Sequence, residues 1–415
     1  MSTTAGDRRR VLVLAYYFPP VGGAGVQRTL KFVRYLVPLG WDATVVSTRS
    51  RAYGARDETL LAEVPSTTRV IRTAALPVAR YLAFALHRLR LKRVRAFLLW
   101  PDGGLGWMPF AFLAAMRAVR RDRPDVLFST SAPYGAHLVA LLVARLTGLP
   151  WVADFRDEWA ANPYLVGQPR LLAGLSERAE RAITRGATKV VVAGDYFRLA
   201  GLAGDDPRRT EIVNGVDQAD LERTSGGPPP DRFVLAHVGS IYDIRDPIPA
   251  LRALASLVTR GVVDVDQVEV RLVGNVWIPG FAPPAGIPVT ATGYVSHEEA
   301  IEEMVSATVL LLYIAPGDLA PSGKLFEYLA SGRPVLCLAP DENLASRLVR
   351  EWGAGIVAAP GDEGAIEEAL TVLWLRWRED GLPLQNEVRA RVFERYSRQA
   401  GAARLASVLE DARLG

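Results

Sequence analysis

The segment from Pro321 to Pro334 holds the residues whose types and spacing are best suited to binding a charged ligand. We expect a short helix with Ser322 as its N-cap, so that unpaired backbone N–H groups at its start lie beside the small Gly323. Lys324 adds a full positive charge to the partial charge of the helix dipole. Glu327 lies three residues further on, on the same exposed face. This combination favours a ligand with phosphates, which bind the helix start, and vicinal hydroxyls, which a carboxylate accepts as donors.

The rest of the segment must position these groups. Leu325, Phe326 and Leu329 form the predicted buried face of the helix. Gly332 lies just past the predicted end of the helix, and Pro334 prevents its continuation. An ordinary capped helix with a solvated lysine and a solvated glutamate would show the same pattern. The helix alone therefore leaves both interpretations open.

A second group of charged residues follows a predicted buried strand at Trp151–Phe155. Asp154 lies near the end of this strand, and Arg156, Asp157 and Glu158 come directly after it. The carboxyl ends of parallel strands are where α/β folds place their chemistry. Asp154 could instead be a structural acid paired with Arg156, and the sequence leaves both interpretations open.

The composition is that of a globular protein with two domains of ordinary size. The chain has 415 residues, 49% of them hydrophobic, and a formal net charge of +4. Its one cysteine, Cys337, lies in an apolar run, which excludes a disulfide framework and a thiolate metal site and favours a reducing compartment. The chain has no window of about 18 uninterrupted apolar residues, so we expect no membrane-spanning helix. The first apolar run breaks at Pro19 and Pro20 without a signal-peptide cleavage site, and we interpret it as a strand.

Strands and helices alternate from that first strand onward. Val11–Ala15 leads into a turn with Gly22 and Gly23, a predicted helix follows, and Ala43–Ser47 returns as the next strand. The glycines lie at the first strand-to-helix turn, where open α/β sheets bind ligands. A dinucleotide-binding fold is the alternative. It is disfavoured because the glycines lack the G-x-G-x-x-G spacing and no acidic residue ends the second strand.

The alternation restarts after a linker at residues 223–232, which is rich in glycine and proline. The pattern predicts two doubly wound α/β domains, at 1–222 and 233–389, facing each other across a hinge. A C-terminal helix at about 390–415 is expected to return to the first domain. The further predicted strands are Asp125–Thr130, Lys189–Ala193, Phe233–Val238, Val268–Val273, Val289–Thr292, Val309–Tyr313, Val335–Leu338 and Ile356–Ala358.

Residues 80–99 form a cationic segment in which arginines alternate with apolar residues. Such a segment can lie in a membrane interface and bind anionic lipid, and it can equally be an exposed helix whose arginines are solvated. No aromatic stacking platform or nucleic-acid motif accompanies it, so nucleic acid is the least favoured partner.

Four motifs occur along the chain in the order known from one enzyme family. They are Phe18–Gly23 (F-P-P-V-G-G), Ile212–Asp217 (I-V-N-G-V-D), Val273–Asn275 and the helix Ser322–Gly332. Together they make the chain resemble a retaining glycosyltransferase of family 4, and Asp154–Asp157 resembles the Asp-Phe-Arg-Asp motif of one subgroup. The resemblance implies the GT-B architecture, an α/β fold of two Rossmann-like domains that face a central cleft.

The family binds a nucleotide-diphosphate sugar mainly with its C-terminal domain and an acceptor mainly with its N-terminal domain. The resemblance implies that Ser322, Gly323 and Lys324 contact the diphosphate. It also implies that Glu327 holds the ribose hydroxyls and that Arg245 grips a phosphate. The predicted catalytic residues are Arg245, Lys324, Asp154 and Asp157; the predicted donor-binding residues are Gly22, Gly23, Gly239, Ser240, Asn275, Ser322, Gly323 and Glu327; the predicted acceptor-binding residues are Tyr134, His137 and Arg156.

Three positions depart from the family pattern, one of them near Arg156, where the family often has a histidine. Leu319 stands where the first of two acids is usual, and Ser240 stands where the family has a cation. The resemblance implies sugar transfer to a hydroxyl with retention, in the synthesis of a cell-surface polysaccharide or glycolipid. It implies no metal and no cofactor, because the nucleotide-sugar is a co-substrate. We expect a cytoplasmic protein held at the inner membrane face through residues 80–99, with a lipid-linked or polysaccharide acceptor and no nucleic-acid partner. The alternatives are a nucleotide-sugar epimerase or hydrolase of the same fold and a non-catalytic binding subunit.

Overall fold

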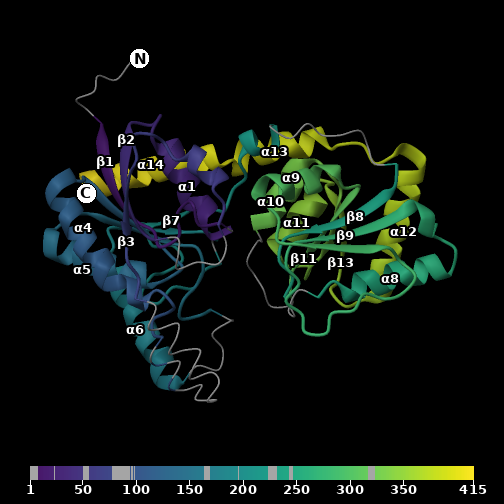
Figure 1. The fold of residues 1–415 in the computed structure, drawn as a ribbon, viewed down its shortest axis with the longest axis horizontal. Helices are drawn as coiled ribbons and strands as arrows, with labels where there is room; N and C mark the ends of the chain where they lie inside the picture. Colours follow the sequence, from purple (N-terminus) through teal and green to yellow (C-terminus); the bar gives the residue numbers. More distant parts are fainter. Residues whose placement is uncertain are drawn as a thin grey trace. The chain divides into compact units, whose positions relative to one another are not determined.

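The computed structural model divides into two compact units (Figure 1). Unit 1 comprises Met1–Val213 and Arg398–Gly415, and unit 2 comprises Asn214–Ser397. The structure describes residues 8–22, 24–49, 56–76, 94, 97, 99–162, 169–194, 196–222, 231–242, 246–315 and 323–415, without the side chains at 24 and 323.

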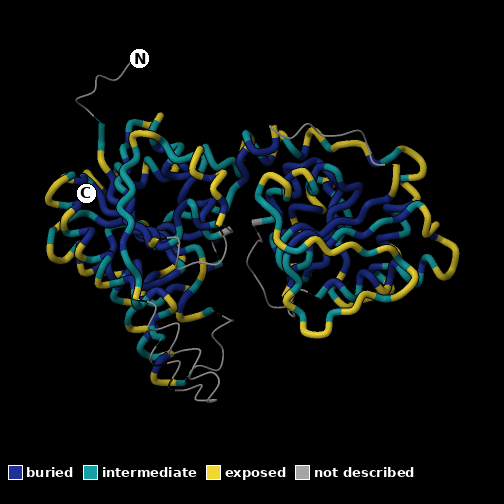
Figure 2. The backbone as a smooth tube through the Cα atoms, viewed as in Figure 1, coloured by how far each residue is buried: buried dark blue, intermediate teal, exposed yellow. Residues whose placement is uncertain are grey.

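Unit 1 contains, in its described residues, a parallel sheet of seven strands. The strands are β1 (Arg9–Leu14), β2 (Trp41–Thr48), β3 (Arg69–Thr73), β4 (Val126–Thr130), β5 (Trp151–Phe155), β6 (Lys189–Val192) and β7 (Arg209–Glu211). They pair in the order β3-β2-β1-β4-β5-β6-β7. Residues 11–14 of the central β1 are buried on both sides, because helices cover both faces of the sheet (Figure 2).

The two faces of this sheet have separate cores. On one face, helices α1 (Ala24–Leu36) and α14 (Arg398–Leu414) bury Leu30 and Leu405 against Val13 and Phe128. On the other face the alanines of α4 pack with residues of α5 and α6. The helices of that second layer are α4 (Met108–Asp122), α5 (Gly135–Thr147) and α6 (Arg170–Gly186), and short 3₁₀ helices lie at η2 (Thr59–Glu63) and η3 (Leu105–Trp107).

Unit 2 contains, where the structure describes it, a parallel sheet of six strands. The strands are β8 (Phe233–Val238), β9 (Val268–Val273), β10 (Val289–Gly293), β11 (Val309–Tyr313), β12 (Val335–Leu338) and β13 (Gly355–Ala358). They pair in the order β10-β9-β8-β11-β12-β13. The helices are α7 (Gln218–Glu222), α8 (Ile248–Thr259), η6 (Val265–Gln267), α9 (His297–Ser306), α10 (Gly323–Ser331), α11 (Leu344–Glu351), α12 (Glu363–Asp380) and α13 (Asn386–Tyr396).

The predicted architecture of two Rossmann-like α/β domains is confirmed. Both sheets are parallel, and the strand order reverses between β1 and β4 and between β8 and β11, as in doubly wound folds. β3 is an edge strand in which only Thr73 is buried, and it was not predicted because its sequence lacks the apolar run of a buried strand. Cys337 is buried in β12, as its apolar neighbours predict.

The C-terminal segment forms two helices where a single helix was predicted. α13 ends at Tyr396, and Ser397 is extended, with φ −69° and ψ 149°. The Tyr396 carbonyl accepts a hydrogen bond from the Val216 N–H at 2.9 Å instead of continuing the helical ladder. Helix α14, which follows, belongs to unit 1, the side to which the sequence pattern assigns it.

The division between the units lies after Val213, ahead of the predicted linker. Residues 214–222, which the sequence pattern assigns to the first domain, belong to unit 2 because Val216 pairs with Ser397 in a β-bridge and α7 packs against α9 and α10. Most of the linker at 223–232 and most of the cationic segment at 80–99 lie outside the described residues. Among the described helices, none combines the length and the apolar character needed to cross a bilayer.

Candidate functional site

The helix predicted from the sequence as a ligand-binding element is α10. Its predicted buried face is confirmed, because Leu325, Phe326 and Leu329 are at most 1% exposed. Gly332 follows with φ +75°, the left-handed conformation expected just past a helix end. The predicted N-cap, Ser322, lies outside the described residues.

Lys324 lies in the first turn of α10, and its side chain runs across Gly239. Gly239 follows β8 with φ +132°, and a Cβ atom there would lie 1.9 Å from Lys324 Nζ. Lys324 Nζ also lies 3.3 Å from Nε2 of His237, in β8. The absent side chain at Gly239 therefore makes room for the lysine. Lys324 and Glu327 are both half-buried.

The segments that follow β8 and β9 approach each other through glycines. Gly274 has φ +124°, and a Cβ atom there would lie 2.7 Å from the carbonyl carbon of Gly239. The Ile241 N–H donates to the Asn275 carbonyl at 2.9 Å, which joins the two segments. The structure thus brings the predicted donor residues Gly239, Ser240 and Asn275 to one edge of the sheet, the edge that the lysine of α10 reaches.

Tyr328 is a residue of this region that sequence analysis missed. It is fully buried in α10, and its hydroxyl accepts from the Val238 N–H at 2.7 Å and donates to the Val238 carbonyl at 3.2 Å. Burial raises the pKa of the phenol, which therefore stays neutral and able to donate. These bonds tie α10 to the end of β8. The spacing of Tyr328 from Leu325 places it on the buried face, which is the signal that could have identified it.

Asp154 has no exposed surface and is paired with an arginine of a distant helix. Nη2 of Arg28 lies 2.7 Å from Asp154 Oδ1, and Nε of Arg28 lies within 3.2 Å of both carboxylate oxygens. Thr130 Oγ1 donates to Oδ2 at 2.7 Å. The geometry therefore favours the interpretation of Asp154 as a structural acid, with Arg28 as its partner instead of Arg156.

Arg156 and Asp157 lie in the segment that follows β5. The Arg156 guanidinium donates to the carbonyl of Gly25 in α1, and burial lowers the pKa of Arg156. Asp157 is exposed, and Gly22, in the turn before α1, is half-buried. Arg156 is thus held beside the start of α1. In the chain, the start of α1 directly follows the turn that contains Gly22. The predicted site residues that lie outside the described part of the chain are Gly23, Arg245 and Ser322, together with the departure at Leu319.

Tyr134 and His137 are packed inside unit 1. The Tyr134 ring stacks on Trp159 with centroids 4.9 Å apart, and its hydroxyl donates to the Glu158 carbonyl at 2.5 Å. His137 has no exposed surface, its Nδ1 lies 2.8 Å from Ser129 Oγ, and burial lowers its pKa to about 3. Its Nε2 has no hydrogen-bond partner among the described residues. Both are core residues, so contact with an acceptor would require this core to open.

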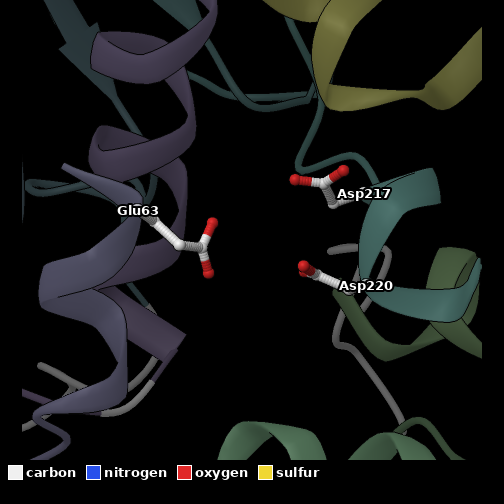
Figure 3. A group of neighbouring side chains, drawn as sticks. All are labelled: Glu63, Asp217 and Asp220. Carbon is white, nitrogen blue, oxygen red and sulfur yellow. The ribbon is translucent and has the colours of Figure 1, made fainter. Parts of the chain in front are cut away.

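Figure 3 shows three acidic residues: Glu63 in η2 of unit 1, and Asp217 and Asp220 at the start of α7 in unit 2. Each is held by a partner within its own unit. Glu63 Oε2 lies 2.5 Å from Lys31 Nζ, an ion pair in which the lysine is fully buried. Asp217 accepts a backbone N–H of α7 at 3.1 Å, and Asp220 lies 3.1 Å from Nε2 of His297. Their contacts within each unit are those of ion pairs and helix caps.

Residues 22–213 match the family model of the glycosyl transferase 4-like domain. The matched range covers almost all of the first segment of unit 1, including β2, β4, β5 and the charged residues that follow β5. No curated protein sequence matches the chain.

Solved structures with the same fold cover nearly the whole chain. HepE from Anabaena, solved in complex with UDP and glucose, aligns with 97% of this chain and 100% of its own at a TM-score of 0.62 and 14% identity. A glycosyltransferase from Rickettsia africae aligns with 98% of this chain and 99% of its own, with a TM-score of 0.64 and 12% identity. A putative UDP-N-acetylglucosamine 2-epimerase from Listeria monocytogenes aligns with 97% of this chain and 96% of its own, with a TM-score of 0.57 and 10% identity. At these identities the likeness shows the fold, which is GT-B.

Proposed function

We propose that the protein is a retaining glycosyltransferase that moves a sugar from a nucleotide-diphosphate sugar to a hydroxyl acceptor. The observation that carries the proposal is the position of Lys324, which brings a cation from the start of α10 across Gly239 to the carboxyl end of β8. Anabaena HepE, which has a similar fold, is solved with UDP and with UDP-glucose, and this supports a nucleotide-diphosphate donor. The match to the glycosyl transferase 4-like domain supports the transferase activity.

In the proposed reaction the bond between the anomeric carbon and a diphosphate oxygen breaks, and the acceptor oxygen bonds to the same face of that carbon. Negative charge develops on the leaving diphosphate. Lys324, the N–H groups at the start of α10 and Arg245 would stabilise this charge, while Glu327 would hold the ribose hydroxyls. The departing phosphate oxygen takes the acceptor proton. Such a reaction needs no pair of carboxylates flanking the bond, in contrast to a glycosidase.

The acceptor side of the proposal rests on unit 1. Asp157 is exposed and Arg156 is held beside the start of α1, so both belong to the surface that follows β5. We infer a lipid-linked or polysaccharide acceptor for a cytoplasmic enzyme attached to the inner membrane face through residues 80–99. The nucleotide-sugar is the co-substrate, and no other cofactor is assigned. Salt-sensitive flotation with anionic vesicles would test the membrane attachment.

Replacement of the lysine tests the proposed function. Lys324→Ala should lower sugar transfer about a hundredfold, because removing one charge-stabilising group from such a site costs about 3 kcal/mol. The donor is first chosen by a thermal-shift screen of nucleoside diphosphates, since a ligand that binds the native state raises its melting temperature. Arg252→Ala, which removes an arginine 62% exposed on α8, is the matched control and should leave transfer unchanged. Unchanged turnover in Lys324→Ala would refute this placement of the diphosphate.

Two alternative functions can be distinguished from sugar transfer by the products that form. A nucleotide-sugar epimerase or hydrolase is favoured by the similarity in fold to the putative epimerase from Listeria monocytogenes. Isomerised or free sugar formed without any acceptor would support that activity. A non-catalytic binding subunit would bind the nucleotide-sugar but would not convert it, either with or without an acceptor.

A further inference from the structure

His237 is a buried titratable residue in unit 2 to which the proposed reaction assigns no role. It lies in β8 and is 4% exposed. Its Nδ1 lies 2.9 Å from the carbonyl oxygen of Leu311, in the neighbouring β11. A carbonyl oxygen can only accept, so Nδ1 carries a proton and donates it. In the neutral ring Nε2 is then the acceptor.

Lys324 supplies the donor for that acceptor. Its Nζ lies 3.3 Å from His237 Nε2, and an ammonium group has donors only, so the bond runs from the lysine to the ring. The two hydrogen bonds form a chain from Lys324 through His237 to the backbone of β11. The chemistry of its two ends fixes the direction of each bond, and the burial of the ring keeps competing water away.

We propose that His237 is a positioning residue that holds Lys324 across Gly239, where a diphosphate would meet the lysine. A lysine side chain loses much rotamer freedom when it is fixed in one place. An anchor that fixes it before the ligand arrives removes that loss from the free energy of binding. This inference rests on the proposed function and adds a residue that the family resemblance did not assign.

A double-mutant cycle separates this role from a purely structural one. The variants are His237→Leu, Lys324→Ala and the double variant, and the measurement is the dissociation constant of UDP by titration calorimetry. ADP, GDP and dTDP are also screened with the wild-type protein, and the tightest of the four is used. Lys324→Ala should weaken binding about tenfold or more, as expected for lost hydrogen bonds to a charged group. His237→Leu should weaken it about threefold to tenfold, and the double variant should be no weaker than Lys324→Ala.

Two controls make the result specific. His237→Gln should bind within about twofold of wild type, because its amide can donate to the Leu311 carbonyl and accept from Lys324. The nucleoside that lacks the diphosphate should have the same dissociation constant for all variants, because it makes no contact with the lysine. If His237→Leu does not fold, His237→Phe keeps the ring volume without the hydrogen bonds and replaces it in the cycle.

The outcomes distinguish the two proposals. Unchanged binding in His237→Leu, or additive losses in the double variant, would overturn the role of His237 while leaving the diphosphate site intact. Unchanged binding in Lys324→Ala, or no binding of any of the four nucleoside diphosphates to the wild-type protein, would overturn the proposed function and this inference with it.

Discussion

At the scale of single residues, burial decides what the charged groups of unit 1 can do. Asp154 and Arg28 are 0% and 5% exposed at their side chains and hold each other through several hydrogen bonds. Removing either partner of such a buried pair would be strongly destabilising, because the other charge would stay buried and uncompensated. Asp154 therefore has a structural partner in Arg28, whereas the neighbouring Asp157 is exposed.

The burial of His137 predicts a loss of stability in acid. Its pKa in the folded state is about 3, below the ordinary 6.5 of the unfolded state, so only the unfolded state gains a proton between these values. The free energy of unfolding should therefore fall by about 1.4 kcal/mol for each pH unit below 6.5 on account of this residue. Above pH 6.5 the residue should have no such effect.

His137→Phe should remove this acid sensitivity, because the new ring can pack beside Phe155, whose ring centroid is 4.5 Å from that of His137. Between about pH 8 and pH 5 the variant should gain about 2 kcal/mol relative to wild type in urea unfolding. Parallel losses in both proteins would contradict the assignment. The same variant tests the predicted acceptor role, since a core residue should leave the KM for the acceptor unchanged.

At the scale of elements, α10 and β8 act as one assembly. Tyr328 joins them through both backbone groups of Val238, and Lys324 crosses the glycine that follows β8. The approach of α10 to the end of β8 therefore shapes the edge of the sheet at which we propose that the diphosphate binds. Gly239 is the position at which the lysine side chain crosses the strand end.

Gly239→Ala should displace the lysine and weaken binding of a nucleoside diphosphate about tenfold, because the added Cβ would lie 1.9 Å from Nζ. The matched control is Gly261→Ala. Gly261 also has a positive φ, +70°, but a Cβ there would meet nothing within 4 Å, so this variant replaces a glycine of positive φ without displacing the lysine. Calorimetric titration compares the two. Equal affinities in both variants would show that the lysine moves aside without consequence.

The sequence predicted these elements well where a signal is local. Val335–Leu338 is an apolar run and forms a buried strand, and the spacing of Leu325, Phe326 and Leu329 gave the correct face of α10. Contacts between distant residues carry no such signal. Arg28 pairs with Asp154 across 126 positions, and the Val216 N–H that interrupts the C-terminal helix comes from an unrelated segment. The burial of His137 likewise depends on the surrounding fold, so its polar side chain gave no sign in the sequence that it lies in the core.

At the scale of the whole molecule, unit 1 is completed by the last helix of the chain. Leu409 of α14 has no exposed surface and lies in the core that α1 shares with the sheet. The unit therefore needs residues from both ends of the sequence. A fragment that stops before α14 would leave this core uncovered.

Leu409→Ala should lower the free energy of unfolding by about 2–5 kcal/mol, the usual cost of truncating a buried leucine. Leu414→Ala, in the same helix but 70% exposed, should change it by less than about 0.5 kcal/mol. Urea unfolding followed by circular dichroism measures both. Similar stabilities of the two variants would show that α14 contributes little to the core of unit 1.

The chemistry of Cys337 has a practical consequence. The thiol is buried in β12, and burial raises its pKa to about 12, so the native protein presents almost no thiolate at neutral pH. Maleimide reagents should therefore modify only a cysteine that is introduced at the surface. Fluorophores or spin labels can therefore be attached at chosen points without first removing the native residue, and the response of each unit to an added nucleotide can be followed by spectroscopy in an otherwise unaltered chain.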